Sequence, residues 1–171
     1  MIIIRPCCTS DLQTIIDLNE SIYAALPDKS ILRHNSPEMI ASCIAHPNVT
    51  LGAWDDTVLA AIGVLYVPQC QAENHAHDLA GIVENATELK VANQKLFLVR
   101  DSHRGLGLQR QLIREVEKMA SERGFQLLCT TCAPHNAFSI NNFLKEGYRY
   151  AKTEEKYGGL TRNIYYKILN I

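Results

Sequence analysis

The segment between residues 89 and 124 constrains the fold of this chain more than any other. Leu89 to Val99 has the length and the mainly apolar composition of a strand, and Gly105 and Gly107 follow a few residues after it. Apolar residues then recur at helical spacing, at Leu108, Leu112, Val116 and Met119. Gly124 is a natural end for that helix. A strand joined by a short glycine turn to an amphipathic helix is typical of α/β proteins.

The rest of the chain continues this mixed pattern. The expected order of elements is β-α-α-β-β-β-α-β-α-β-β, with a hairpin over residues 49–67 and a last pair of strands over 148–152 and 164–169. A polar stretch at 68–85 separates two strands and is longer than most connections. The chain has 171 residues and shows no repeat or linker. We therefore expect one α/β domain, residues 1–171, around a single mixed sheet flanked by helices.

Charge and termini narrow the class of protein. Lys and Arg total 17 and Asp and Glu total 18, for a net charge of −1, which argues against a dedicated nucleic-acid binder. The first apolar run, Met1 to Ile4, is cut short by Arg5 and Pro6 and is too short for a signal peptide or a membrane span. We expect no membrane association, a cytoplasmic location, and six cysteines that are reduced thiols.

The turn between the central strand and helix is the first candidate site. Gly105 and Gly107 let an anion approach the backbone where the helix begins. The first helical N–H groups have no partner within the helix, the dipole is positive there, and Arg104 adds a charge. A pyrophosphate would suit this position. Judged from these residues alone, a plain strand-to-helix turn is equally well supported. The segment lacks the Gly-Lys-Ser/Thr ending of a P-loop.

Three motifs together resemble one family. Arg104-Gly105-Leu106-Gly107-Leu108 resembles the acetyl-CoA pyrophosphate loop of the GNAT acyltransferase superfamily. Asn136-Ala137-Phe138-Ser139, followed by Gly147-Tyr148, resembles the second block of that family, and residues 4–12 resemble its first strand and helix. Segments 73–79 and 157–162 are similar to a bacterial branch of undefined substrate. The resemblance covers essentially the whole chain.

The resemblance implies a sheet that splays open between the strands at 89–99 and 125–132, with a thioester in the gap. It implies acetyl-CoA as cosubstrate, no metal, and direct attack by a primary amine of a small molecule in a ternary complex. Many members are dimers, so a homodimer is possible. The residues expected to bind the cofactor are Leu98, Val99, Arg104, Gly105, Leu106, Gly107, Leu108, Gln109, Asn136, Ser139 and Phe143.

Two departures from the family pattern bear on catalysis. Gln109 stands where the loop usually ends in Gly or Ala, although its backbone N–H is still available. Phe143 stands where many members carry a Tyr that protonates the departing thiolate, and Phe has no proton to give. Tyr157 and Tyr148 are therefore candidate acids and Glu88 a candidate base. Two alternatives stay open: a catalytically weak or inactive CoA-binding sensor or interaction domain, and a protein N-acetyltransferase.

Two further patterns are given structural interpretations. His75, His77 and Asp78 are possible metal ligands, but no second cluster accompanies them, so we expect a solvated loop and no metal site. Cys129 and Cys132 have redox spacing but lie on a predicted strand, where residues three apart point to opposite faces. We expect both to be core residues.

Overall fold

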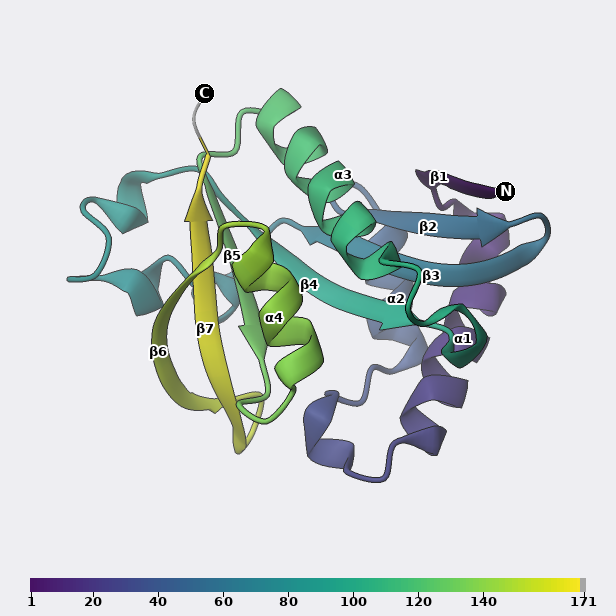
Figure 1. Cartoon of the computed structure of the whole chain (residues 1–171). Helices are drawn as coiled ribbons and strands as arrows, with labels where there is room; N and C mark the ends of the chain where they lie inside the picture. The colour runs from purple at the N-terminus through teal and green to yellow at the C-terminus, as the bar shows by residue number, and fades with distance from the viewer. Residues whose placement is uncertain (170–171) are drawn as a thin grey trace.

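The sheet is the centre of the structure, and one pair of strands in it differs from the rest. The computed structural model describes residues 1–169. Its seven strands lie in the order β1-β2-β3-β4-β5-β7-β6 (Figure 1), and only β4 and β5 run parallel. The strands are β1 Ile2–Pro6, β2 Val49–Asp55, β3 Val58–Tyr66, β4 Val91–Val99, β5 Leu127–Cys132, β6 Arg149–Lys156 and β7 Leu160–Ile168.

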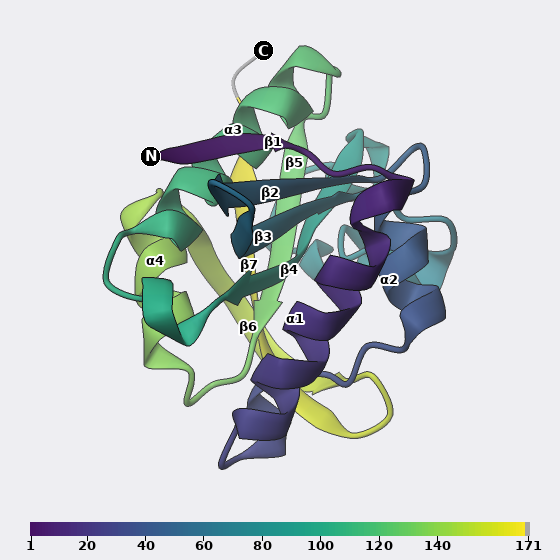
Figure 2. The same ribbon diagram turned by 90° about the vertical axis from the view of Figure 1, so that its right-hand side faces the viewer.

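Four α-helices cover the two faces of this sheet. They are α1 Leu12–Ala25, α2 Pro37–Ile44, α3 Leu108–Glu122 and α4 Ala137–Lys145. Helices α3 and α4 lie on one face, and α1 and α2 lie on the other (Figure 2). The predicted order of elements and the single mixed α/β sheet are confirmed. None of the helices in residues 1–169 is both long and apolar enough to cross a membrane.

The last two strands are longer than predicted. Strand β6 extends to Lys156 and β7 begins at Leu160, so the hairpin turn is only Tyr157 to Gly159. The extra residues are mostly polar, and polar residues on an exposed edge hairpin carry little periodic signal. Tyr157, Gly158 and Gly159 have φ of 55°, 78° and 115°, and this left-handed path closes the turn.

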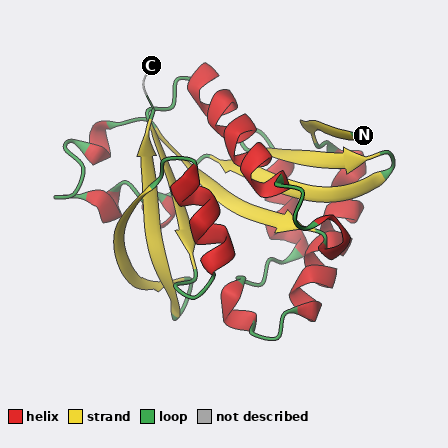
Figure 3. Cartoon of the chain, viewed as in Figure 1, coloured by secondary structure: helices red, strands yellow, loops and turns green. Residues whose placement is uncertain are grey.

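The long connection before β4 packs against the sheet and forms a third hydrophobic cluster. Short 3-10 turns cross residues 71–88 (Figure 3). Its Ala76, Leu79 and Val83 are buried against Cys129 and Ile164. This cluster lies on the same sheet face as α1 and α2, over the strands that those two helices do not cover. Cys132 belongs to the cluster on the opposite face, as predicted for residues three apart on a strand.

Strands β4 and β5 separate after a short stretch of pairing. Their pairing covers Val91 to Asn93 of β4, and the last pair is Asn93 with Cys129. Beyond it β4 carries one extra residue relative to β3, since Gly63 pairs with Phe97 but Leu65 pairs with Gln94. Such a bulge bends a strand and leaves its extra residue out of the ladder. The splayed sheet that the family resemblance implied is present.

Candidate active site

A groove of about 450 Å³ lies where β4 has left β5. Its walls come from the last residues of β4, the starts of α3 and α4, and the connection between α1 and α2. Six of the residues predicted to bind the cofactor line it, namely Leu98, Val99, Arg104, Gln109, Asn136 and Ser139. The sequence motifs lie in separate parts of the chain, and residues from each of them line this one groove.

The glycine turn at the start of α3 has room for a ligand. Gly105 and Gly107 have φ of 82° and 72°, and a Cβ at either would meet no heavy atom within 4 Å. Gly107 is the N-cap of α3 and no side chain caps the helix. The first N–H groups of α3 are therefore open to an anion. Arg104 lies beside them, paired with Asp101 at 2.8 Å, and both side chains are largely exposed, so the pair is weak.

Gln109, the departure from the family loop, holds the two helix starts together. Its buried side chain donates a hydrogen bond from Nε2 to Ser139 Oγ at 2.9 Å, and its Oε1 accepts one from Asn142 Nδ2 at 2.9 Å. Asn136 caps α4, because its Oδ1 accepts a hydrogen bond from the Ser139 N–H. These contacts fix the groove wall before any ligand binds.

The remaining predicted cofactor residues do not line the groove. Leu108 is buried in the core under α3, and Leu106 is exposed to solvent. Phe143 is only 1% exposed and packs edge-on against Phe97 and Tyr148. The sequence-based expectation for Phe143 is therefore corrected: the apolar ring completes the core between α4 and the sheet instead of facing the cofactor groove.

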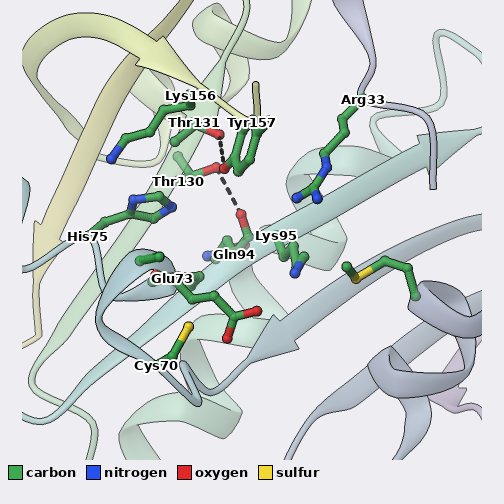
Figure 4. Close-up of a pocket in the computed structure, with 13 residues that line it drawn as sticks. Arg33, Cys70, Glu73, His75, Gln94, Lys95, Thr130, Thr131, Lys156 and Tyr157 are labelled. Carbon is green, nitrogen blue, oxygen red and sulfur yellow. Dashed lines mark hydrogen bonds between the residues drawn. The ribbon is translucent and has the colours of Figure 1, made fainter. Parts of the chain in front are cut away.

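A second cavity, of about 370 Å³, is also lined by β4 and is named here the acceptor cavity. Figure 4 shows its lining, which comes from residues far apart in the chain. Residues 93–95 of β4 line it, whereas residues 97–99 of the same strand line the groove. The other lining residues are Arg33, Met39, Cys70, Ala72, Glu73, His75, Thr130, Thr131, Lys156 and Tyr157. The bulge in β4 thus lies between the two.

Glu73 places a carboxylate in the acceptor cavity. Its Oε1 accepts a hydrogen bond from the Tyr66 hydroxyl at 2.8 Å, and its Oε2 accepts one from the Gln69 N–H at 3.0 Å. Partial burial opposes ionisation of this carboxyl group. The two hydrogen bonds and the charges of Lys95 and Arg33 outweigh that cost and lower its pKa. Glu73 is therefore ionised at neutral pH and can accept a proton or bind an ammonium group.

Two cations face the same space. Lys95 Nζ stands 3.6 Å from the centroid of the Tyr66 ring, and burial lowers the pKa of this amine. The Arg33 guanidinium lies 4.7 Å from the centroid of the Tyr157 ring. Both arrangements are cation–π contacts, which stabilise a cation that has left bulk water.

The segment around His75 is ordered by a hydrogen bond and an ion pair, which corrects the expectation of a solvated loop. His75 is buried, and its Nδ1 lies 3.0 Å from Asp78 Oδ2. The same carboxylate oxygen accepts a hydrogen bond from Lys156 Nζ at 2.6 Å. The segment is thereby tied to the end of β6, at the cavity wall. No group of three or more His, Cys, Asp or Glu that could hold a metal occurs in residues 1–169.

The candidate catalytic residues from the sequence have different positions. Tyr157 lines the acceptor cavity, and its hydroxyl lies 2.9 Å from Thr131 Oγ1. Tyr148 is 3% exposed, and its hydroxyl accepts a hydrogen bond from Gln94 within the core. Glu88 is exposed on the turn before β4 and lines neither cavity. Tyr148 and Glu88 are thus corrected to positions outside the site.

Sequence reasoning missed the charged residues of the acceptor cavity. Arg33 and Lys95 belong to no motif, and the resemblance of segment 73–79 assigned no role to Glu73. Arg33 is 37 positions or more from the cavity residues of the long connection, the nearest being Cys70. The length of the connection at 68–85 was the one available signal, because long ordered connections often carry function. It could not show which of its side chains points inward.

The comparisons with known proteins agree with this geometry. The family model of the acetyltransferase (GNAT) family matches residues 17–148. The chain therefore belongs to the GNAT acetyltransferase family, whose members use acetyl-CoA as acyl donor. A search of curated proteins returned no match.

Solved structures with the same fold are distant in sequence. The Arabidopsis thaliana protein NAA60, in complex with a bisubstrate analogue, is 15% identical with a TM-score of 0.75, over 99% of this chain and 100% of that one. The Salmonella typhimurium protein yncA, with its cofactor acetyl-CoA, is 15% identical with a TM-score of 0.71, over 100% and 95%. A ribosomal-protein alanine N-acetyltransferase from Escherichia coli is 16% identical with a TM-score of 0.73, over 100% and 96%. At these identities the likeness shows the fold alone.

Proposed function

We propose that this protein is an N-acetyltransferase that moves the acetyl group of acetyl-CoA to a primary amine of a small molecule. One observation carries the proposal: two consecutive stretches of β4, residues 93–95 and 97–99, line two different cavities on either side of the bulge, where β4 has parted from β5. The groove on one side is lined by six of the residues that the family resemblance assigns to the cofactor. The cavity on the other side holds a carboxylate and a tyrosine hydroxyl, the groups that an amine and a leaving thiolate need.

The donor would lie along the groove with its pyrophosphate at Arg104 to Gln109. The N–H groups at the start of α3 supply hydrogen bonds and Arg104 supplies charge. Leu98 and Val99 offer backbone groups to the pantetheine arm, with Asn136 and Ser139 along its other side. The thioester then reaches the bulge, where N–H groups of β4 that lie outside the ladder stabilise the oxyanion.

The reaction is a direct transfer within the ternary complex. The amine nitrogen attacks the thioester carbonyl, the new C–N bond forms and the C–S bond breaks, giving an amide and CoA. The amine loses one proton and the thiolate gains one. Glu73, directly or through a water, is the proposed acceptor of the first proton, and Tyr157 the proposed donor of the second. Positioning of the two reactants supplies much of the rate.

Calorimetric titration with acetyl-CoA, with CoA and ATP as controls, tests the first half of the proposal. We expect acetyl-CoA and CoA to bind with dissociation constants in the micromolar range and ATP not to bind. Release of the CoA thiol in the presence of a panel of amines tests the second half. Binding without turnover would favour the CoA-binding sensor, which the buried Phe143 and Tyr148 make a specific alternative. Acetylation of peptide N-termini in preference to small amines would favour a protein N-acetyltransferase.

A further inference from the structure

Two cations in the acceptor cavity form no ion pair with any described residue. Within residues 1–169, no carboxylate oxygen lies within 4.0 Å of the charged nitrogens of Arg33 or Lys95, and neither side chain donates a hydrogen bond. Their contacts are the faces of Tyr157 and Tyr66. Both residues are half-buried.

Other cations of the same region are neutralised by the protein itself. Lys156, on the same cavity wall, pairs with Asp78 at 2.6 Å and with Glu154 at 3.0 Å. A partly buried cation without a counter-ion is costly, because it has lost water and gained no charge in return. The contrast with Lys156 indicates that an anion is missing from the space before Arg33 and Lys95.

The carboxylate of Glu73 does not fill that role. It is held by Tyr66 and by the Gln69 N–H, and Arg33, Lys95 and Glu73 together leave one uncompensated positive charge. Figure 4 shows the three side chains directed into one space from different segments. A molecule that carries both an amine and an anion would place the amine toward Glu73 and the anion toward Arg33 and Lys95. At about 370 Å³ the cavity is at the small end for ligand sites.

We propose that the acceptor is a small molecule that carries a carboxylate beside its amine, as an α-amino acid does, and that Arg33 and Lys95 bind the carboxylate. This inference rests on the proposed acetyltransferase function of the same site. The Arg33 guanidinium matches a carboxylate with two parallel hydrogen bonds, and Lys95 adds a point charge. The same two charges repel acceptors with several amines, and they favour the neutral, nucleophilic form of the one amine that attacks.

The test compares L-α-amino acids with their carboxamides as acceptors, at saturating acetyl-CoA, by release of the CoA thiol. The amine of a carboxamide is less basic, so its intrinsic reactivity at neutral pH favours the amide. We expect the acid of at least one pair to have the higher kcat/KM, by about tenfold or more, as charge-assisted hydrogen bonds give. Arg33→Gln and Lys95→Gln should raise KM for the acid and remove this preference. The control Lys145→Gln, at an exposed cation on α4, should not.

Equal or better use of the amides, or an equal loss for acid and amide in Arg33→Gln, would overturn the inference. Binding of N-acetyl-L-amino acids and their amides to the CoA-loaded protein gives a second readout that needs no turnover. Acid-selective binding that Arg33→Gln abolishes would support the inference even if turnover failed. Absence of acid-selective binding and of acid-selective turnover would refute it, while acetyl-CoA binding and turnover of other amines would leave the proposed function standing.

Discussion

The cofactor groove and the acceptor cavity share one strand but are built in different ways. The groove takes its polar residues from two short segments, 104–109 and 136–139, each at the start of a helix. The acceptor cavity takes Arg33, Glu73, Lys95, Thr131 and Tyr157 from five separate segments. The first is a helix-start geometry that local sequence can encode. The second exists only once the sheet has assembled.

The largest effect should come from closing the groove. Gly107→Trp puts a side chain into open space in front of the α3 N-terminus and strains a φ of 72°. We expect acetyl-CoA affinity to fall about 100-fold or more, since the anion loses its backbone partners. The matched control is Gly81→Trp, which has a φ of 80° and equally open surroundings but lies outside both cavities. Calorimetry that found Gly107→Trp binding like Gly81→Trp would remove the basis of the cofactor assignment.

The next largest effect should be a loss of catalysis without a loss of cofactor binding, which distinguishes the acceptor cavity from the groove. Glu73→Gln keeps the size of the side chain but removes the proton acceptor from the acceptor cavity. We expect kcat to fall about 100-fold, the usual lower scale for loss of a general base, with acetyl-CoA affinity unchanged. Glu88→Gln serves as control because this carboxylate is exposed and outside both cavities. Normal kcat in Glu73→Gln, or a loss in Glu88→Gln, would contradict the assignment of the base.

Tyr157 and Tyr148 should respond differently to loss of the hydroxyl group, because Tyr157 lines the acceptor cavity and Tyr148 is in the core. Tyr157→Phe removes a hydroxyl from the acceptor cavity and should lower kcat about tenfold without loss of stability, for want of the proton donor. Tyr148→Phe should instead lower stability by about 1 kcal/mol, because Gln94 loses a buried partner, and leave kcat near normal. Steady-state kinetics and urea unfolding on both variants check this; reversed phenotypes would exchange their roles.

Phe143→Tyr probes the family's usual acid position. Phe143 is 1% exposed in a packed aromatic cluster, so an added hydroxyl would be buried without a known partner. We expect a loss of about 1–3 kcal/mol in the free energy of unfolding and no gain in kcat. A faster variant would show that the side chain reaches the thioester after all.

The smallest effect should be the change in stability that the ionisation of Asp78 causes at low pH. Burial opposes ionisation of Asp78, but hydrogen bonds from His75 and Lys156 outweigh it and lower its pKa. A lowered pKa contributes stability that is fully present above the unfolded value of about 3.9 and is lost progressively as the pH falls from that value through the folded pKa. Asp78→Asn should therefore be less stable than wild type at pH 6, by about 1–2 kcal/mol, and the gap should narrow at pH 3 and close only at still lower pH. Urea midpoints at pH 6 and pH 3 measure the gap; a gap that does not narrow between them would mean that charge is not the cause.

Local sequence determined the elements and the groove, whereas the tertiary structure decided the acceptor cavity. The apolar pattern of 89–124 specified a strand, a glycine turn and a helix, because the local backbone geometry of each element sets the spacing of the side chains that share a face. Arg104 to Gln109 could be read for the same reason. The burial of Phe143 and Tyr148, the bridging role of Gln109 and the inward position of Glu73 depend on which segments pack together. Residues that lie far apart in the sequence form no periodic pattern that could reveal their contacts. Only the assembled sheet therefore brings Arg33, Glu73 and Lys95 to one place.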